Sequence, residues 1–516
     1  MNLLRSIVTV GGMTLISRVL GFVRDVLIAA VLGAGVIADV FFVAFKLPNL
    51  FRRLFAEGAF SAAFVPLYSG ILEDQGKAPA QAFAEAALSV LLWAMLVLVA
   101  VVELAMPVVM HGFAPGFADD PAKFDFAVLL TRITFPYLLF ISLVSLMAGI
   151  LNSLGRFAAA AATPILLNLC LIGAVLVLAP FAATPAHALA WGVAGAGIVQ
   201  FLWLFWHCAR VGVRLHLPWP RLTADVRALM RRILPVALGA GVYQISLLID
   251  TVIASLLPSG SISYLFFADR VNQLPLGVVG VAVGTALLPL LSRQLRAGDT
   301  AAATASQNRA LEFSLLLSLP AAAALMVIAH PVVTVLFERG EFGPTEAQAT
   351  AAALAVYASG LPAYVLVKAL APGYFARGDT ATPVKISVLC LVVNLVLNLI
   401  LMGPFLHVGI AAATSVSAWL NAVLLAIFLR RRGLLEFDRR LGRVSSRLVF
   451  ATAVMAILVA VGAEGLSPWL AGGEVSRIAA LAALVVGGAV IYGLAVLAVG
   501  AVRIADLRRW IDREGA

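Results

Sequence analysis

Long apolar runs recur along the chain and are separated by short polar connections. A helix that crosses a bilayer needs about 20 apolar residues, so each run predicts one transmembrane helix. The predicted spans, fourteen in all, lie at residues 8–31, 37–70, 83–110, 128–153, 160–180, 188–208, 233–257, 264–292, 311–336, 348–374, 384–403, 408–429, 447–464 and 478–502. They account for most of the chain, and the fold class they predict is an all-α membrane protein.

Composition supports this fold class and excludes several functions. Of 516 residues, 62% are hydrophobic and 12% are charged, against about 25% charged residues in soluble proteins. The connections leave no room for a soluble catalytic domain of about 100 residues. The chain has no phosphate-loop motif, and its six histidines fall near span ends without metal-ligand spacing. We therefore expect a transporter and not an enzyme.

Basic residues between the spans predict the orientation of the chain. If the N-terminus is cytoplasmic, all of these basic residues lie on the cytoplasmic side except Lys123, Arg339 and Arg477. Such a bias follows the positive-inside rule. It predicts that both termini are cytoplasmic and that the number of spans is even. The net charge of +10 is thereby explained by topology, and no nucleic-acid partner is expected.

Two halves of the chain show a weak internal repeat. The segment 25–35 aligns with 250–260, and Phe41-Phe42 then falls on Phe266-Phe267. Six spans per half is an even number, so the halves are expected to share one orientation, as in transporters that work by alternating access. The predicted domains are an N-terminal lobe (1–210), a basic cytoplasmic linker (211–232), a C-terminal lobe (233–430), a basic cytoplasmic loop (431–446), and the last two spans with the tail (447–516).

Charged residues interrupt the first two spans. The first holds Arg18, Arg24 and Asp25, and the second holds Asp39, Lys46, Arg52, Arg53 and Glu57. A charge at the bilayer centre costs about 3 kcal/mol on insertion scales, so such residues face a partner or a watery cavity. The region 37–70 is either a long span that bends near Pro48 and Gly58 or an interfacial helix with snorkelling side chains. Only the first alternative preserves an even number of spans.

The spacing of these charges points to an anion. Asp39, Lys46 and Arg53 recur every seven residues with Asn49 between the last two, so they share one helical face. Arg53 and Glu57 are four apart and can pair, while the second half adds Asp269 and Arg270. Cations outnumber acids in this set, and the planar fork of arginine suits phosphate oxygens. The set predicts a cavity that attracts a diphosphate; the alternative is structural ion pairing.

A second group of polar residues lies in the other half. Asp250 is in mid-span, Asn394 and Asn398 are four apart on one helical face, and Thr414 lies in the next span. Oxygen ligands of this kind can hold a hard cation or, at Asp250, a proton. Hydrogen bonds between packed spans explain the same residues equally well.

Several segments resemble the MurJ (MviN) family of lipid II flippases. They are MNLLRSIVTVGGMTLISRVLGFVRD, ADVFFVAFKLPNLFRRLFAEGAFSAAFVPLYS, HGFAPGF, FADR and APGYFARGDTATPVK, which together run from residue 1 to about 430. The resemblance implies the fold of the multidrug/oligosaccharidyl-lipid/polysaccharide exporter superfamily, with two six-helix lobes around a central cationic cavity plus two C-terminal helices. It also implies that the chain flips lipid II, an undecaprenyl-diphosphate-linked peptidoglycan precursor, from the inner to the outer leaflet of the bacterial inner membrane.

The resemblance assigns roles to individual residues. It implies substrate binding by Arg18, Arg24, Arg52 and Arg270, with Lys46, Arg53 and Asn49, and support from Asp25, Asp39, Glu57 and Asp269. A sodium site as in some members would comprise Asp250, Asn394, Asn398, Ile410 and Thr414. Asn398 stands where some members carry a second Asp, which removes one negative charge. No cofactor is expected beyond coupling to sodium or protons. Lipid II and bilayer lipid are the expected partners, with peptidoglycan-synthesis proteins as further candidates, and we expect a functional monomer.

Two transporter classes remain as alternatives. A flippase for another diphosphate-linked oligosaccharide would need the same arginines and would differ only in sugar recognition. A multidrug exporter of the same superfamily would share the topology, but an exporter of cationic drugs would carry an acidic cavity.

Overall fold

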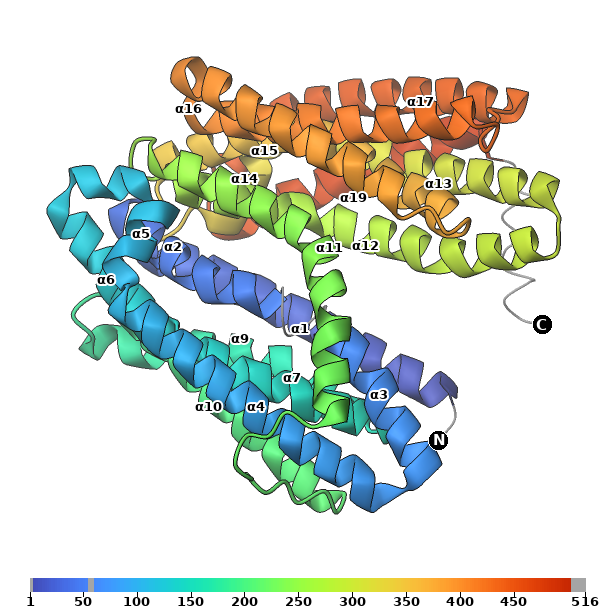
Figure 1. Cartoon of the computed structure of the whole chain (residues 1–516). Helices are drawn as coiled ribbons and strands as arrows, with labels where there is room; N and C mark the ends of the chain where they lie inside the picture. Colours follow the sequence, from blue (N-terminus) through green and yellow to red (C-terminus); the bar gives the residue numbers. More distant parts are fainter. Residues whose placement is uncertain (1–2, 54–59, 503–516) are drawn as a thin grey trace. The chain divides into compact units, whose positions relative to one another are not determined.

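The structure, a computed structural model, describes residues 3–53 and 60–502. Residues 3–8, 234–243, 278–279, 281–282 and 285 are described by their backbone alone. The described residues form helices, and their only β-type pairing is an isolated bridge between Arg339 and Phe342 (Figure 1). The all-α fold class predicted from the apolar runs is confirmed.

Contacts divide the chain into two compact units. The first comprises residues 1–263 and 339–342, and the second comprises 264–338 and 343–516. The boundary falls inside one helix, α12, whose first three residues belong to the first unit. This is a division by contacts and not by sequence repeat, so the lobe boundaries inferred from the repeat stay a prediction.

The helices of the first unit follow the predicted spans with local breaks. They are α1 (Leu3–Leu32), α2 (Val36–Phe51), α3 (Phe60–Gln75), α4 (Lys77–Leu104), α5 (Met106–Phe113), η2 (Pro115–Asp119), α6 (Pro121–Thr134), α7 (Tyr137–Ser153), α8 (Phe157–Ala161), α9 (Thr163–Gly173), η3 (Ala174–Leu178), η4 (Ala179–Phe181), α10 (Pro185–Arg210), α11 (Ala224–Ser255) and the start of α12 (Ser261–Arg296).

The second unit contains most of α12 and the later helices. These are α13 (Thr300–Val327), α14 (Ala329–Phe337), α15 (Pro344–Phe375), α16 (Ala381–Arg431), α17 (Arg439–Gly465), α18 (Ser467–Leu470) and α19 (Glu474–Ala498). In the described part of the chain, nine helical segments are long and apolar enough to cross a membrane. The chain is thus a multi-pass membrane protein, and the number fourteen stays a prediction.

Two predicted spans are merged in α16 across a sharp break. Leu406 has φ 49° and ψ −131°, a backbone conformation that non-glycine residues rarely adopt. Three residues later, a side chain on Gly409 would place its Cβ 2.3 Å from the Leu401 carbonyl oxygen. The break therefore lies between the predicted spans 384–403 and 408–429, where the sequence predicts a turn.

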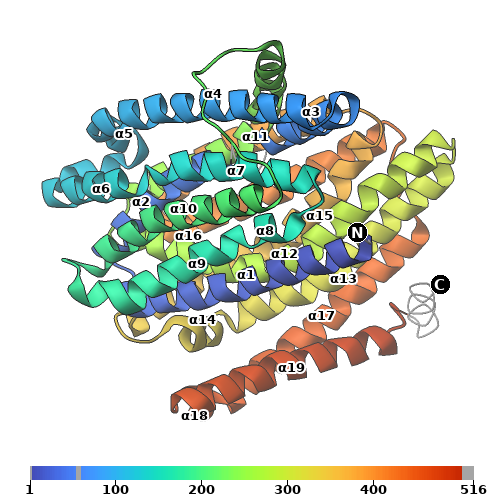
Figure 2. The same ribbon diagram turned by 90° about the horizontal axis from the view of Figure 1, so that it is seen from below.

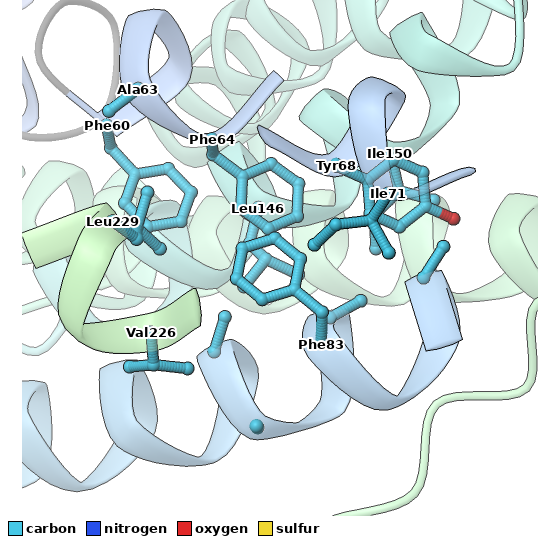
Figure 3. Packing of buried hydrophobic residues seen from close by; sticks show 14 residues of the cluster. Phe60, Ala63, Phe64, Tyr68, Ile71, Phe83, Leu146, Ile150, Val226 and Leu229 are labelled. Carbon is cyan, nitrogen blue, oxygen red and sulfur yellow. The ribbon is translucent and has the colours of Figure 1, made fainter. Parts of the chain in front are cut away.

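An aromatic cluster forms the core at one end of the first unit. Phe60, Phe64 and Tyr68 stack one turn apart along α3, and Phe83 of α4 stacks on Phe64 with ring centroids 5.5 Å apart. Leu146 and Ile150 of α7, with Val226 and Leu229 of α11, complete the cluster (Figure 3). Close packing of these rings holds α3, α4, α7 and α11 together, because van der Waals contacts favour helix association in a membrane.

The last long helices run side by side in the second unit. Figure 2 shows α17 and α19 adjacent to each other, in agreement with their many shared contacts. Tyr492 on α19 donates a hydrogen bond from its hydroxyl to the Leu316 carbonyl of α13, at 2.8 Å. Arg309 of α13 pairs with Glu312 and with Asp438, the residue that caps the N-terminus of α17. Polar contacts thus attach both helices to α13.

The turn between α1 and α2 lies against the segment 339–342 within the first unit. The Glu341 N–H donates to the Ala30 carbonyl at 2.9 Å. Gly33 and Gly340 have φ of +63° and +59°, and a Cβ on them would lie 2.5 Å from the Glu341 oxygen and 2.2 Å from the Ala30 oxygen, respectively. Only glycine fits both the backbone conformation and the close approach.

We therefore expect Gly33→Ala to destabilise the protein by about 1–3 kcal/mol, because the methyl group must displace the Glu341 backbone and the residue must keep a positive φ. The midpoint of thermal unfolding in detergent measures this. Gly195→Ala is the matched control, since Gly195 is helical with no atom within 4 Å of the added Cβ. It should leave the midpoint unchanged or slightly higher. Equal midpoints for the two variants would contradict the close packing.

Candidate functional site

Arg24 and Asp25 form a buried ion pair on α1. The Arg24 Nη2 lies 2.6 Å from the Asp25 Oδ1, and its Nε donates to the same oxygen at 2.9 Å. The two residues are 7% and 3% exposed. Both were predicted as charges within a span, and the structure shows that they neutralise each other. Removing one partner of such a pair leaves an uncompensated buried charge, at a cost of about 3–5 kcal/mol.

Asn168 of α9 is a third member of this network. Its Oδ1 accepts from the Arg24 Nη1 at 2.9 Å, and its Nδ2 donates to the Ser17 carbonyl of α1 at 2.9 Å. A Cβ on Gly21 would lie 3.4 Å from the Asn168 Nδ2, so the small glycine lets the amide reach α1. The charges and polar groups that mark the predicted site in the sequence do not include Asn168. A polar residue inside the apolar run TPILLNLCLIG is the signal that could have identified it.

The hydrogen bonds of Arg24 use part of its donor capacity. A guanidinium carries five N–H groups, and three hydrogen bonds join Arg24 to its described neighbours. The other two N–H groups make no hydrogen bond to a described residue, and the orientation of the fork is held from both sides. This arrangement suits an oxyanion, because phosphate oxygens accept charge-assisted hydrogen bonds from arginine in a planar, bidentate geometry.

The other predicted cations of the first unit differ in their surroundings. Arg18 is exposed on α1, and Lys46, Arg52 and Arg53 are partly buried. The Arg52 Nε donates to the Asn49 Oδ1 at 2.8 Å, one turn back, so these two predicted site residues do meet. Residues 52–53 continue α2 as a turn of π-helix, four residues after Pro48. Glu57 and the predicted bend at Gly58 lie outside the described residues.

Asp39 contacts the start of α12. It is 1% exposed, and its carboxylate accepts from the Gly260 N–H at 2.6 Å and from the N–H and hydroxyl of Ser263 at 2.9 and 2.6 Å. A carboxylate at a helix N-terminus satisfies otherwise unpaired N–H groups and interacts favourably with the helix dipole. Asp39 thus joins α2 to the α11–α12 turn.

Two more contacts reinforce this junction. The Lys123 Nζ donates to the Ser259 Oγ at 3.1 Å and lies 4.2 Å from the centroid of the Phe117 ring. Gly116 packs so closely that a Cβ would lie 2.1 Å from the Ser255 carbonyl oxygen. We call these contacts, made by Asp39, Gly116 and Lys123 with residues 255–263, the clasp.

The predicted charges of the second unit lie on one stretch of α12. Asp269 accepts a hydrogen bond from Gln273 one turn further along, and the Arg270 guanidinium lies 4.8 Å from the centroid of the Phe266 ring. Arg270 and Asp269 are partly buried. Because these residues belong to the second unit, the structure describes them separately from Arg18, Arg24 and Arg52.

The predicted sodium ligands are also divided between the units. In the second unit, Asn398 donates from Nδ2 to the Asn394 Oδ1 at 3.1 Å, and the Thr414 hydroxyl donates to the Ile410 carbonyl at 2.8 Å. Both asparagines are buried. Asp250 belongs to α11 in the first unit and is partly buried. Cation binding by this set stays a prediction, and the observed hydrogen bonds are those that packed helices also make.

Comparison with known proteins places the chain among lipid flippases. A family model described as lipid II flippase MurJ matches residues 28–479. A protein of Rhizobium meliloti (strain 1021) named probable lipid II flippase MurJ is 46% identical over 521 residues, which cover 99% of this chain and 97% of the relative. A protein of Burkholderia cenocepacia named lipid II flippase MurJ is 39% identical over 463 residues, covering 89% and 90%.

Solved structures agree on the fold. One titled lipid II flippase MurJ, inward closed conformation, has a TM-score of 0.78 at 22% identity and covers 94% of this chain and 97% of that one. An inward-facing multidrug resistance transporter of the MATE family has a TM-score of 0.69 at 13% identity, covering 83% and 98%. At these identities the structures support the fold alone.

The role of the Asp39 carboxylate in holding the clasp together can be tested by substitution. Asp39→Asn removes the charge and turns one acceptor oxygen into a donor that faces N–H groups, so we expect a loss of about 1–3 kcal/mol. In a variant without native cysteines, Ser261→Cys should then react several times faster with a water-soluble maleimide, because Ser261 is only 3% exposed while the clasp is closed. Asp299→Asn is the control, because Asp299 caps only its own helix. Unchanged labelling with Asp39→Asn would show that the carboxylate does not hold the clasp.

Proposed function

We propose that this chain, which belongs to the lipid II flippase MurJ family, translocates lipid II across the membrane. Its relatives carry that name over nearly their whole lengths. The substrate contains a diphosphate between its polyprenyl tail and its sugars, so a binding site must provide positive charge inside an apolar protein. The structural likeness to a MATE transporter concerns the fold and gives no reason to prefer drug export.

The observation that supports this function best is the restrained guanidinium of Arg24. A free arginine within a span would be costly, and a fully paired arginine could not bind an anion. Arg24 avoids both problems, since Asp25 balances its charge while two N–H groups remain for phosphate oxygens. Arg52, held by Asn49, and Arg270, held over Phe266, are further cations that we assign to the same substrate.

Movement of the substrate follows from alternating access. In our proposal the head group binds the arginines from the cytoplasmic side while the clasp closes the opposite end. Release then requires the Asp39 carboxylate to leave the N–H groups of Gly260 and Ser263, which exposes all three to water. The polyprenyl tail stays in lipid throughout. No bond in the substrate is made or broken, so the chain acts as a transporter and not as a catalyst.

We also propose the setting of this activity. The chain lies in the bacterial inner membrane as a monomer, with both termini in the cytoplasm, where it receives precursor from peptidoglycan-synthesis proteins. The membrane potential or a cation gradient supplies the energy, since each elementary charge moved through 100 mV contributes about 2.3 kcal/mol. A cation at Asp250, or at the Asn394–Asn398 pair with Thr414, would couple such a gradient to the cycle.

The function is tested by removing the anion-binding arginines. Asp25 is neutralised together with Arg24, so that no buried carboxylate loses its partner. We expect the double variant Arg24→Ala/Asp25→Asn, and separately Arg52→Ala, to weaken precursor binding about 10- to 100-fold, because each loses charge-assisted hydrogen bonds. Weaker binding should lower the fraction of lipid II that reaches the outer leaflet. This fraction is measured in cells depleted of their own flippase that produce each variant.

Arg231→Ala is the control for these variants, since Arg231 is an exposed arginine at the start of α11. It should leave translocation intact. Membrane abundance of each variant is measured in parallel. If correctly inserted Arg24 and Arg52 variants translocate lipid II at the normal rate, the proposed function of these residues is wrong.

Asn168 offers a second test, because an amide can be kept or removed at this position. Asn168→Gln keeps an amide that can accept from Arg24 and donate to the Ser17 carbonyl, whereas Asn168→Leu loses both hydrogen bonds. If Asn168 orients Arg24, the Leu variant should need a higher precursor concentration for half-maximal transport and the Gln variant should be closer to normal. Equal defects in both would indicate a structural role only. Asn152→Leu is the control, because the Asn152 side chain forms no hydrogen bond to a described residue.

A further inference from the structure

One face of α17 combines exposed arginines with an exposed apolar stripe. Arg439 and Arg443 are exposed at the start of the helix, and Phe450, Ile457 and Val461 are 60%, 63% and 60% exposed further along. At 100° per residue these five side chains fall within an arc of about 40°. The buried residues of α17, which are Leu441, Val444, Leu448, Ala451, Thr452, Met455 and Val459, occupy the opposite side.

The neighbouring arginines are already engaged. Arg440 lies 3.6 Å from the Glu312 carboxylate, and Arg447 donates to the Gly500 carbonyl at 2.7 Å. Arg432 pairs with Asp379, whose pKa is lowered to about 2 by hydrogen bonds from the Thr382 N–H and hydroxyl and by Arg432 itself. The side chains of Arg439 and Arg443, by contrast, have no ion pair or hydrogen bond to another described residue.

The dimensions of the face match one leaflet. Phe450 and Val461 are eleven residues apart, or about 16 Å along a helix, which is about half of a 30 Å hydrocarbon core. Arg443 lies two turns before Phe450, about 10 Å away. Long arginine side chains at a span end reach towards the head-group region. The two guanidinium groups therefore stand at the level of lipid phosphates when the apolar stripe lies among acyl chains.

From this arrangement we propose that α17 carries a binding site for an anionic phospholipid. Its phosphate binds Arg439 and Arg443, and an acyl chain lies along Phe450, Ile457 and Val461. A zwitterionic head group is a poorer ligand, because its ammonium group is repelled by two adjacent guanidinium groups. The leaflet is the one on the side where α17 begins, which the charge pattern predicts to be cytoplasmic. The proposal does not depend on the transported substrate.

Two other occupants share part of this chemistry. The polyprenyl diphosphate of a lipid-linked precursor also combines phosphate with a hydrocarbon chain, and the C-terminal residues 503–516 include Asp506, Asp512 and Glu514. We favour the phospholipid because the stripe faces outward from the helices that bury the other side of α17. Phospholipid is the molecule that such a surface meets at high concentration in a bilayer.

The test is a titration of the full-length protein in detergent with phosphatidylglycerol or phosphatidylcholine, followed by native mass spectrometry. The wild-type protein should bind phosphatidylglycerol more tightly than phosphatidylcholine. Arg439→Gln/Arg443→Gln should weaken phosphatidylglycerol binding about tenfold and leave phosphatidylcholine binding unchanged. Arg439→Lys/Arg443→Lys should largely preserve binding, which separates loss of charge from misfolding.

Arg293→Gln/Arg296→Gln is the matched control. It also removes two exposed arginines from the second unit, but those on α12 donate to carbonyls of their own helix, at Pro289 and Ser292. It should not change the affinity for phosphatidylglycerol. The proposal is overturned if both double variants bind phosphatidylglycerol equally well. It is also overturned if the α17 variant loses affinity for undecaprenyl diphosphate instead, or if deleting residues 503–516 is required before wild-type protein binds either phospholipid.

Discussion

The requirement that a charge inside the membrane must have a partner determines the arrangement around α1. Lipid tails are as apolar as leucine side chains, so apolar surface alone does not draw two spans together. A guanidinium within a span is different, because every donor that it leaves unpaired is costly. Arg24 satisfies this requirement with Asp25 on its own helix and Asn168 on α9. Asn168 in turn holds the α1 backbone at Ser17, so the position of α9 along α1 follows from one buried charge.

The same requirement explains the contacts of Asp39, whose carboxylate is satisfied by backbone N–H groups and not by a cation. Its carboxylate is almost completely buried, and the nearest donors are N–H groups at the start of α12. These N–H groups have no helical acceptor of their own, so carboxylate and helix end satisfy each other. A contact of this kind is strong only while both sides remain dry. It can therefore hold a closed state firmly and still be exchanged for hydration by water when the segments separate.

Much of this structure could be predicted from the sequence, but the partners of the charges could not. Apolar runs identified the helices, and the short gap between the predicted spans 384–403 and 408–429 coincides with the break at Leu406. Arg24 and Asp25 stood out as charges within a span. Their pairing could not be predicted, because consecutive residues on a helix usually point in different directions. Only the length of the arginine side chain allows its guanidinium to reach the Asp25 carboxylate. Heptad spacing grouped Asp39 with Lys46 and Arg53, whereas its observed hydrogen-bond donors lie more than 220 residues away.

Arginines outside the apolar spans show how the surroundings set the role of one residue type. Arg309 and Arg432 meet carboxylates. The Arg309 pair attaches the start of α17 to α13, and the Arg432 pair joins the end of α16 to a residue just before its first turn. Arg293 and Arg296 donate to carbonyls near the end of their own helix, where the dipole favours a cation. Arg439 and Arg443 have neither kind of partner among the described residues, although they lie on the same short helical segment as the engaged Arg440 and Arg447. Orientation accounts for the difference, since the engaged pair points towards protein and the other pair points away from it. A positive charge that points away from protein at a span end finds its counter-charge in the lipid, and this is why we assign the face below it to a phospholipid.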